Sequence, residues 1–235
     1  MIKGVLNKCG VLIIALSVFW GCSKDNATSA DAGAAGQGTY VYNLAGDTAA
    51  SVGIEEGKTQ RAFYPLLFDF STGESHLLKT AADSAQYVTG NWDIAFTAQY
   101  NSIVIPNNGS YQNTLGYGGP GSFIIMAINT AFDKVTAAPS DDAMKAAAMQ
   151  SIGWDQGDGQ GWFYYSTNNH ICVAVTDRTF IFKTSDGLYG KVEFISIYKD
   201  HPAVVTDLYW PAPYLSFRYF LQKDGSTNLT TSSNS

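Results

Sequence analysis

The chain has 235 residues and a formal net charge of −6 at pH 7, with 14% charged residues, 14% aromatic residues and 23 glycines. The acidic balance argues against a nucleic-acid-binding protein, because such proteins carry clustered positive charge to meet the phosphates. Few charges with many aromatic residues and glycines favour a sheet-rich fold over a helical bundle, and the length suits one domain with a core.

Residues 1–21 have the pattern of an export signal. Lys3 and Lys8 precede a short apolar run, residues 11–16, which is too short to cross a membrane as a helix. Gly21-Cys22 resembles the lipobox of bacterial lipoproteins, in which the cysteine is acylated and becomes the mature N-terminus. Ordinary cleavage that leaves Cys22 free is the alternative. Loss of the two lysines would change the net charge from −6 to −8.

The two ends of the exported chain are polar and lack periodicity. Residues 22–38 are predicted to be an acylated cysteine followed by a flexible tether, and residues 224–235 a disordered tail with nothing to bury. The folded domain is therefore expected over residues 39–223. Once Cys9 is removed and Cys22 acylated, Cys172 stands alone, so we expect no internal disulfide.

Most of the domain is predicted to be a series of strands. Alternating or continuous apolar runs indicate them, in chain order, over residues 39–42, 63–70, 76–79, 92–96, 123–128, 162–165, 171–175 and 214–221. In the segment 92–96, the alternation places Trp92, Ile94 and Phe96 on one core face. In the last strand, alternate residues from Leu215 to Leu221 share a face.

Residues 178–198 are predicted to form a β-hairpin around Asp186-Gly187. A two-residue turn would pair core side chains with solvent-facing ones. A three-residue loop, with Gly187 in the left-handed region, pairs Phe180 with Val192 and Phe182 with Gly190. Because a slip of one residue sends every side chain to the other face, we predict the three-residue loop.

One helix is predicted after Pro139, where Ser140 or Asp141 can cap an alanine-rich segment that stops at Gly153. Together these elements predict an all-β protein, a single antiparallel β-sandwich or sheet domain with one short helix.

Four segments, in this order, resemble a known family. They are FDFSTGE (68–74), WDIAF (92–96), RTFIFKTSDGLYGKVEF (178–194) and LSFRYFLQKDGS (215–226). With the lipoprotein signal, they are similar to the HmuY-like haemophore family, exported all-β lipoproteins that capture haem for an outer-membrane receptor. The resemblance implies an outer-membrane, lipid-anchored protein whose expected partners are haem or a related tetrapyrrole and a TonB-dependent receptor. The lysine and acidic residues directly after Cys22 look like the surface-export signals of some Gram-negative lipoproteins, which predicts a domain that faces outward.

The resemblance also implies two axial haem ligands, histidine in some members and methionine in others. They come from loops that the four segments only bracket. After the Gly-Trp strand of residues 161–165, the matching position is Thr167, which is no iron ligand, and His170 follows three residues later. The other region contains Met144 and Met149. These two are unsuited to bind one iron together, because on a helix they lie about 140° apart around the axis.

We therefore predict His170 as one axial ligand, paired with Met149 or Met144, as His/Met ligation suits haem iron. The alternatives are a solvated loop histidine and methionines that pack a helix on the sheet. His76 and His201 are expected on the surface. No metal site beyond the haem iron is expected.

A different ligand on the same scaffold remains an alternative. The aromatic residues of the loops could stack on a sugar ring or a peptide instead of a porphyrin; they are Tyr111, Tyr117, Trp154, Trp162 and Tyr164. A structural or adhesion lipoprotein without a pocket is a further alternative. The sequence has no GxSxG, HExxH or Walker motif, so we expect a binding protein and no enzyme.

Overall fold

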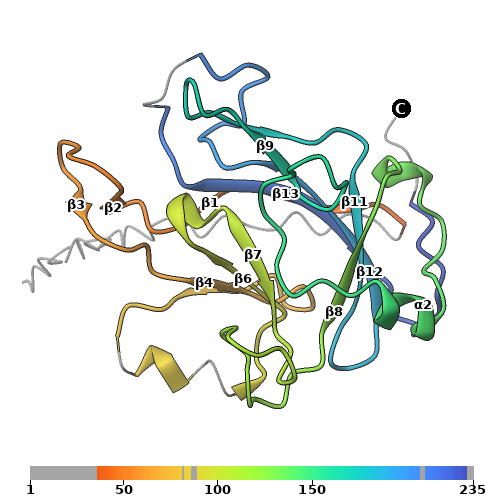
Figure 1. The fold of residues 1–235 in the computed structure, drawn as a ribbon. Helices are drawn as coiled ribbons and strands as arrows, with labels where there is room; N and C mark the ends of the chain where they lie inside the picture. The colour runs from red at the N-terminus through yellow and green to blue at the C-terminus, as the bar shows by residue number, and fades with distance from the viewer. Residues whose placement is uncertain (1–35, 81, 86–88, 207–209, 232–235) are drawn as a thin grey trace, which may run out of the picture.

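The structure is a computed structural model that describes residues 36–80, 82–85, 89–206 and 210–231. Its body consists of two antiparallel sheets (Figure 1). The five-stranded sheet has the order β1 (Thr39–Ala45), β13 (Tyr214–Leu221), β12 (Tyr189–Ser196), β11 (Thr179–Lys183) and β8 (Ile124–Ile128). The four-stranded sheet has the order β5 (Ser75–Leu77), β4 (Leu66–Phe68), β6 (Ile94–Thr97) and β7 (Ile103–Pro106). The predicted all-β fold is confirmed.

Two strand pairs stand apart from these sheets. The antiparallel pair is β9 (Phe163–Tyr165) with β10 (Cys172–Ala174), and the parallel pair is β2 (Ala50–Ser51) with β3 (Thr59–Gln60). The β2–β3 pair projects from the body of the molecule (Figure 1). The β9–β10 pair and the loop that joins β2 to β3 line the same cavity.

The helical elements are short. They are η1 (Asp83–Ala85), η2 (Gln99–Asn101), η3 (Phe132–Lys134) and α2 (Asp141–Ala146). The side chain of Ser140 caps α2 as predicted, accepting a hydrogen bond from the amide of Ala143 at 3.3 Å. The helix ends earlier than predicted, and the chain then turns so that the amide of Met149 bonds to the carbonyl of Ile125 in β8. In the described ranges, no helix has the length and apolar character needed to cross a bilayer.

Aromatic rings from both sheets fill the core between them. Phe70 stacks on Phe182 of β11 with ring centroids 4.4 Å apart, and Phe68 of β4 meets Phe217 of β13 edge-on at 5.1 Å. Alternate residues of β13 from Leu215 to Leu221 all join this core, as their spacing predicts. The sheets therefore form a sandwich, held mainly by aromatic packing.

The predicted hairpin register is confirmed. In the β11–β12 ladder Phe180 pairs with Val192 and Phe182 with Gly190, and Gly187 in the loop has φ +85°. The ring of Phe182 lies over Gly190, where an added Cβ would come within 2.2 Å of the ring. Glycine is therefore required at this point of β12 by close approach of a neighbouring ring.

The position of Trp92 differs from the prediction. Ile94 and Phe96 lie in the core between the sheets, whereas Trp92 packs with Leu67 and Ala95 on the opposite face of the four-stranded sheet. The alternation of β6 begins only at Ile94. Because Trp92 precedes the strand, its direction does not follow the period of two.

The second face of the five-stranded sheet is covered as well. Lys191 is fully buried there, with its ammonium group donating to the carbonyls of Phe132 and Val135 and to the hydroxyl of Thr231. Leu229 is also fully buried, and its amide bonds to the carbonyl of Thr136. The prediction that the chain after residue 224 has nothing to bury is therefore wrong for this part of the tail, because one leucine and one hydroxyl fix it to the sheet.

The remaining predictions about the chain's ends concern residues that the structure does not describe. The export signal (1–21), the acylated Cys22 and nearly all of the tether (22–38) lie outside the described residues, as do residues 232–235.

Candidate functional site

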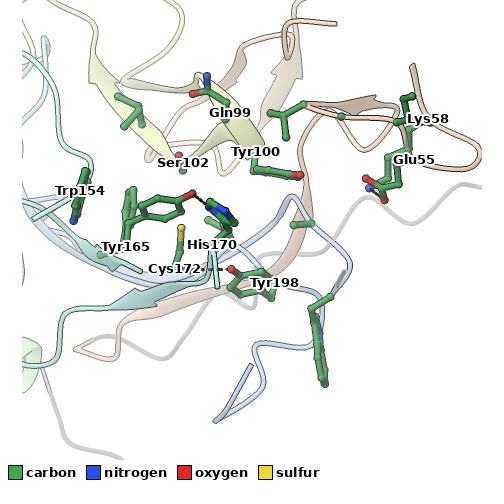
Figure 2. A pocket seen from close by; sticks show the side chains of 18 residues that line it. Glu55, Lys58, Gln99, Tyr100, Ser102, Trp154, Tyr165, His170, Cys172 and Tyr198 are labelled. Atoms are coloured by element: carbon green, nitrogen blue, oxygen red, sulfur yellow. Dashed lines mark hydrogen bonds and ion pairs between the residues drawn. The ribbon is translucent and has the colours of Figure 1, made fainter. Parts of the chain in front are cut away.

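A cavity of about 670 Å³ lies between the β9–β10 pair, the η2 turn and the loop that joins β2 to β3 (Figure 2). Its walls are mostly aliphatic and aromatic. Its polar groups are one imidazole, one thiol, three tyrosine hydroxyls, the side chains of Gln99 and Ser102, two indole nitrogens and an ion pair at the loop. A volume of several hundred Å³ with apolar walls and a few polar groups is typical of a small-molecule site.

His170 reaches this cavity from the turn between β9 and β10. Its amide donates to the carbonyl of Ser166, and the amide of Ser166 donates to the carbonyl of Ile171, which closes the turn. The backbone of His170 has φ +58°, a conformation uncommon for residues other than glycine. The turn therefore holds the imidazole at the end of the two strands, where it lines the cavity and remains exposed.

The imidazole of His170 is oriented by a neighbouring tyrosine. Its Nδ1 lies 2.6 Å from the hydroxyl of Tyr165, and Figure 2 shows the two side chains turned toward each other. Among the described residues, none bonds to Nε2. A tyrosine hydroxyl can accept a hydrogen bond from Nδ1–H, which leaves a lone pair on Nε2. This arrangement resembles that of metal-bound histidines, whose other nitrogen donates to a fixed acceptor.

Cys172 and Tyr198 form a second polar pair in the cavity. The backbone amide of Cys172 donates to the hydroxyl of Tyr198 at 2.9 Å. Burial raises the pKa of the Cys172 thiol to about 12 and that of the Tyr198 hydroxyl to about 12. At neutral pH both groups are therefore uncharged, and Cys172 lacks the thiolate that metal binding or nucleophilic attack requires.

Tyr100 enters the cavity from the η2 turn, whose backbone is strained. Ala98, Tyr100 and Asn101 have φ of 59°, 54° and 51°. Each such conformation costs on the order of 1–3 kcal/mol and persists only where the surrounding structure enforces it. Asn101 is fully buried and supplies that enforcement: its amide group donates to the carbonyls of Tyr64 and Phe96, and its oxygen accepts from the amide of Asp47. The turn thereby presents Tyr100 to the cavity.

The loop between β2 and β3 forms the remaining wall. Lys58 and Glu55 pair there at 2.5 Å, and the side chain of Ile54 is fully exposed. A cation at the cavity gives a group that can meet a carboxylate of a ligand.

The two predicted methionine ligands lie elsewhere. Met149 is 8% exposed and packs in the core between the sheets, and Met144 is fully buried in the cluster that covers the other face of the five-stranded sheet. Neither lines the cavity with His170. The predicted His/Met pairing is therefore not supported, because either thioether would have to leave a packed core to reach a ligand there.

The other candidates are also separated from the cavity. The ring of His76 contacts Asp83 at 2.9 Å, and His201 lies against the ring of Tyr42. Asp155, in the turn that precedes β9, forms a buried ion pair with Arg178 at 2.8 Å. The described ranges contain no group of three or more His, Cys, Asp and Glu side chains placed to hold a bare metal ion.

The aromatic residues considered for sugar stacking do not form one platform. Trp162 is 3% exposed and donates through its indole nitrogen to the carbonyl of Ser102. Of the five candidates, Trp154 alone is among the residues that line the described cavity, where its ring meets that of Tyr165 edge-on.

The sequence did not predict the three tyrosines that line the cavity with His170. They are Tyr100, Tyr165 and Tyr198. Fourteen tyrosines are present in the chain, and no spacing distinguishes these three. The turn of residues 98–101 before β7 matches no known sequence motif. Its backbone conformation depends on hydrogen bonds of Asn101 to the distant residues Asp47 and Tyr64.

Comparison with protein families identifies the chain's relatives. A family model described as "HmuY protein" matches residues 65–209, more than half of the chain. The chain belongs to the HmuY family. The match contains three of the four segments that carry the resemblance in the sequence, and it includes β9, β10 and the η2 turn that border the cavity.

Solved structures similar to this HmuY-family chain share little sequence with it. A "putative HmuY_like heme binding protein" from Bacteroides vulgatus ATCC 8482 is 14% identical, with a TM-score of 0.42, covering 79% of this chain and 92% of that one. Apo PinO from Porphyromonas gingivitis is 14% identical, with a TM-score of 0.43 and coverage of 80% and 98%. An apo HmuY analogue from Tannerella forsythia is 16% identical, with a TM-score of 0.36 and coverage of 79% and 95%. No curated protein matches the chain.

Proposed function

We propose that this chain binds haem or a related tetrapyrrole in the cavity beside His170, as a carrier rather than an enzyme. The observation that carries the proposal is the arrangement of His170: Tyr165 holds Nδ1, no described residue engages Nε2, and the imidazole lines the cavity. Membership in the HmuY family supports it, since the resemblance implies haem capture.

The residues present fit a tetrapyrrole. The ligand is flat, apolar and edged with carboxylates, and bound haem supplies an iron centre that takes axial ligands from the protein. Nε2 of His170 is suited to bind that iron. Trp154 and the aliphatic residues of the cavity supply apolar walls, and Lys58 supplies a positive charge for a carboxylate.

The export and transfer steps are part of the proposal. Acylation of Cys22 would anchor the protein to the outer membrane, with the domain at the cell surface, and the captured haem would pass to an outer-membrane receptor. The basis is the signal-like N-terminus and the lipobox-like Gly21-Cys22. Labelling cells with a radioactive or clickable fatty acid should mark the wild-type chain and leave Cys22→Ser unlabelled. If Cys22→Ser is labelled as well, Cys22 is not the site of acylation.

Titration of the purified full chain with haemin tests the binding. We expect a sharpened Soret band that saturates at one equivalent. His170→Ala should lower the affinity by at least about tenfold, because loss of even an outer partner of a metal ligand costs 10–100-fold.

Three variants serve as controls. His76→Ala and His201→Ala remove the two histidines that lie away from the cavity, and Met149→Leu removes a sulfur while keeping its volume. All three should bind like the wild type. A spectrum that collapses in Met149→Leu would restore methionine as a ligand. A wild-type spectrum no different from free haemin would reject haem and favour a glycan or peptide ligand.

A further inference from the structure

We propose that Tyr100 is the second axial ligand of this site, so that the chain holds haem iron between an imidazole and a phenolate and takes up ferric haem in preference to ferrous haem. This inference rests on the proposed function. It replaces the methionine that the sequence predicted, because both candidate methionines lie in packed clusters away from the cavity.

Elimination among the cavity residues leads to Tyr100. Apart from His170 and Cys172, the cavity side chains that can bind iron are Glu55, Lys58 and the three tyrosines. Glu55 and Lys58 pair with each other at 2.5 Å. The hydroxyl of Tyr165 is engaged by His170, and that of Tyr198 by the amide of Cys172. The hydroxyl of Tyr100 has no hydrogen-bond partner among the described residues, although its ring packs on that of Phe63 with centroids 5.0 Å apart. Tyr100 therefore combines a fixed ring with a free oxygen.

The two proposed ligands come from opposite parts of the site. His170 belongs to the β9–β10 turn and Tyr100 to the turn between β6 and β7, and in Figure 2 Tyr165 and Tyr100 lie on either side of His170. Both ligands have a positive φ, 58° and 54°, which is uncommon for residues with a side chain. Strained backbone at a ligand-binding turn is the kind of outlier from which a functional role is inferred. The buried Asn101 maintains the strain at Tyr100.

Binding through Tyr100 has a simple chemical balance. The phenol proton passes to solvent, the phenolate oxygen donates a lone pair to the iron, and nothing is oxidised or reduced. An anionic oxygen favours the more highly charged ferric iron, and tyrosinate is an established haem ligand.

Comparison of Tyr100→Phe with the wild-type full chain tests the inference. Wild-type protein titrated with haemin should show a phenolate-to-iron charge-transfer band and phenolate vibrations in resonance Raman spectra. Tyr100→Phe should lose both signals and bind ferric haem at least about tenfold more weakly. Tenfold is the smallest loss in metal affinity that is typical when a hydrogen-bond partner of a metal ligand is removed, and loss of the ligand itself should cost at least as much. Reduction with dithionite should weaken binding to the wild type more than binding to Tyr100→Phe.

Two further variants make the result decisive. Tyr165→Phe should keep the charge-transfer band, since that hydroxyl acts on His170 and not on iron. Tyr100→His should recover ferric affinity with a low-spin spectrum, because it supplies a second nitrogen ligand. This variant also keeps the inference testable if the Tyr100→Phe chain does not fold. Retention of the band in Tyr100→Phe, or its loss in Tyr165→Phe alone, would overturn the role of Tyr100. A wild type without any saturating haem spectrum would instead overturn the proposed function itself.

Discussion

Replacing Phe182 by alanine should lower the free energy of unfolding by about 3–5 kcal/mol, the usual cost of truncating a buried phenylalanine. Phe182 is fully buried and stacks on Phe70 at 4.4 Å and on Phe123 at 5.2 Å. Its ring also covers Gly190 in the neighbouring strand, so truncation opens a cavity over a residue that has no side chain to fill it. Since native stabilities are about 5–15 kcal/mol, this change removes a large share of the total.

Chemical denaturation followed by tryptophan fluorescence measures this loss. The matched control is Tyr164→Ala, which truncates an aromatic residue that is 51% exposed and should change stability by no more than about 0.5 kcal/mol. If Phe182→Ala costs no more than the control, the ring stack does not hold the two sheets together.

Lys191→Ala should cost at least about 3 kcal/mol at neutral pH. The substitution removes a buried four-carbon chain and leaves the carbonyls of Phe132 and Val135 without their donor, each loss costing about 1–3 kcal/mol. The bond to Thr231, which fixes the C-terminal segment to the sheet, is lost as well.

The control for this change is Lys183→Ala on the adjacent strand. Lys183 pairs with Asp141 at 2.7 Å, but both side chains are partly exposed, so this pair is expected to contribute no more than about 1 kcal/mol. The free energy of unfolding of both variants, measured in urea, decides the question. Equal costs for the two lysines would show that the bonds of Lys191 contribute little.

Because Lys191 is buried, the free energy of unfolding should also depend on pH. Burial lowers its pKa to about 8, with nearby Arg218 acting in the same direction and Asp133 opposing it, whereas an unfolded lysine titrates near 10.4. Between these values the unfolded chain binds more protons than the folded one. The titration of Lys191 therefore adds an increment of stability that is fully present above about pH 10.4 and is lost as the pH falls through about 8. The hydrogen bonds and buried carbon chain of Lys191 contribute separately from this increment, so a cost of Lys191→Ala remains at neutral pH.

The slope from this one group is at most about 1.4 kcal/mol per pH unit. The stability of the wild type minus that of Lys191→Ala, measured from pH 7 to pH 10, should rise with pH. Subtracting the variant removes the tyrosines and Cys172, which titrate in a similar range. A difference that stays flat would place the folded pKa of Lys191 near its ordinary value.

The sequence determined the fold class and much of the sheet register. The alternation in β13 and in β11–β12 is local information, and the conformational demand of Gly187 selects one loop length, so a one-residue slip is excluded before any tertiary contact is known. The cap of α2 was also visible, since Ser140 acts on an amide three residues away. The loop position of His170 was recognised, although not the neighbours that orient it.

The surroundings of His170 could not be predicted, because they depend on contacts between distant segments. Tyr100, Tyr165 and Tyr198 come from three separate segments, and Met149 and Met144 are drawn into two different packed clusters. Only the tertiary structure decided that Lys191 is buried, because its alternation shows only that it faces away from Phe180, not what covers that face. The physical reason is the same in each case. Periodicity and turn chemistry act over a few residues along the chain, whereas burial and a binding cavity arise from segments that meet only after folding.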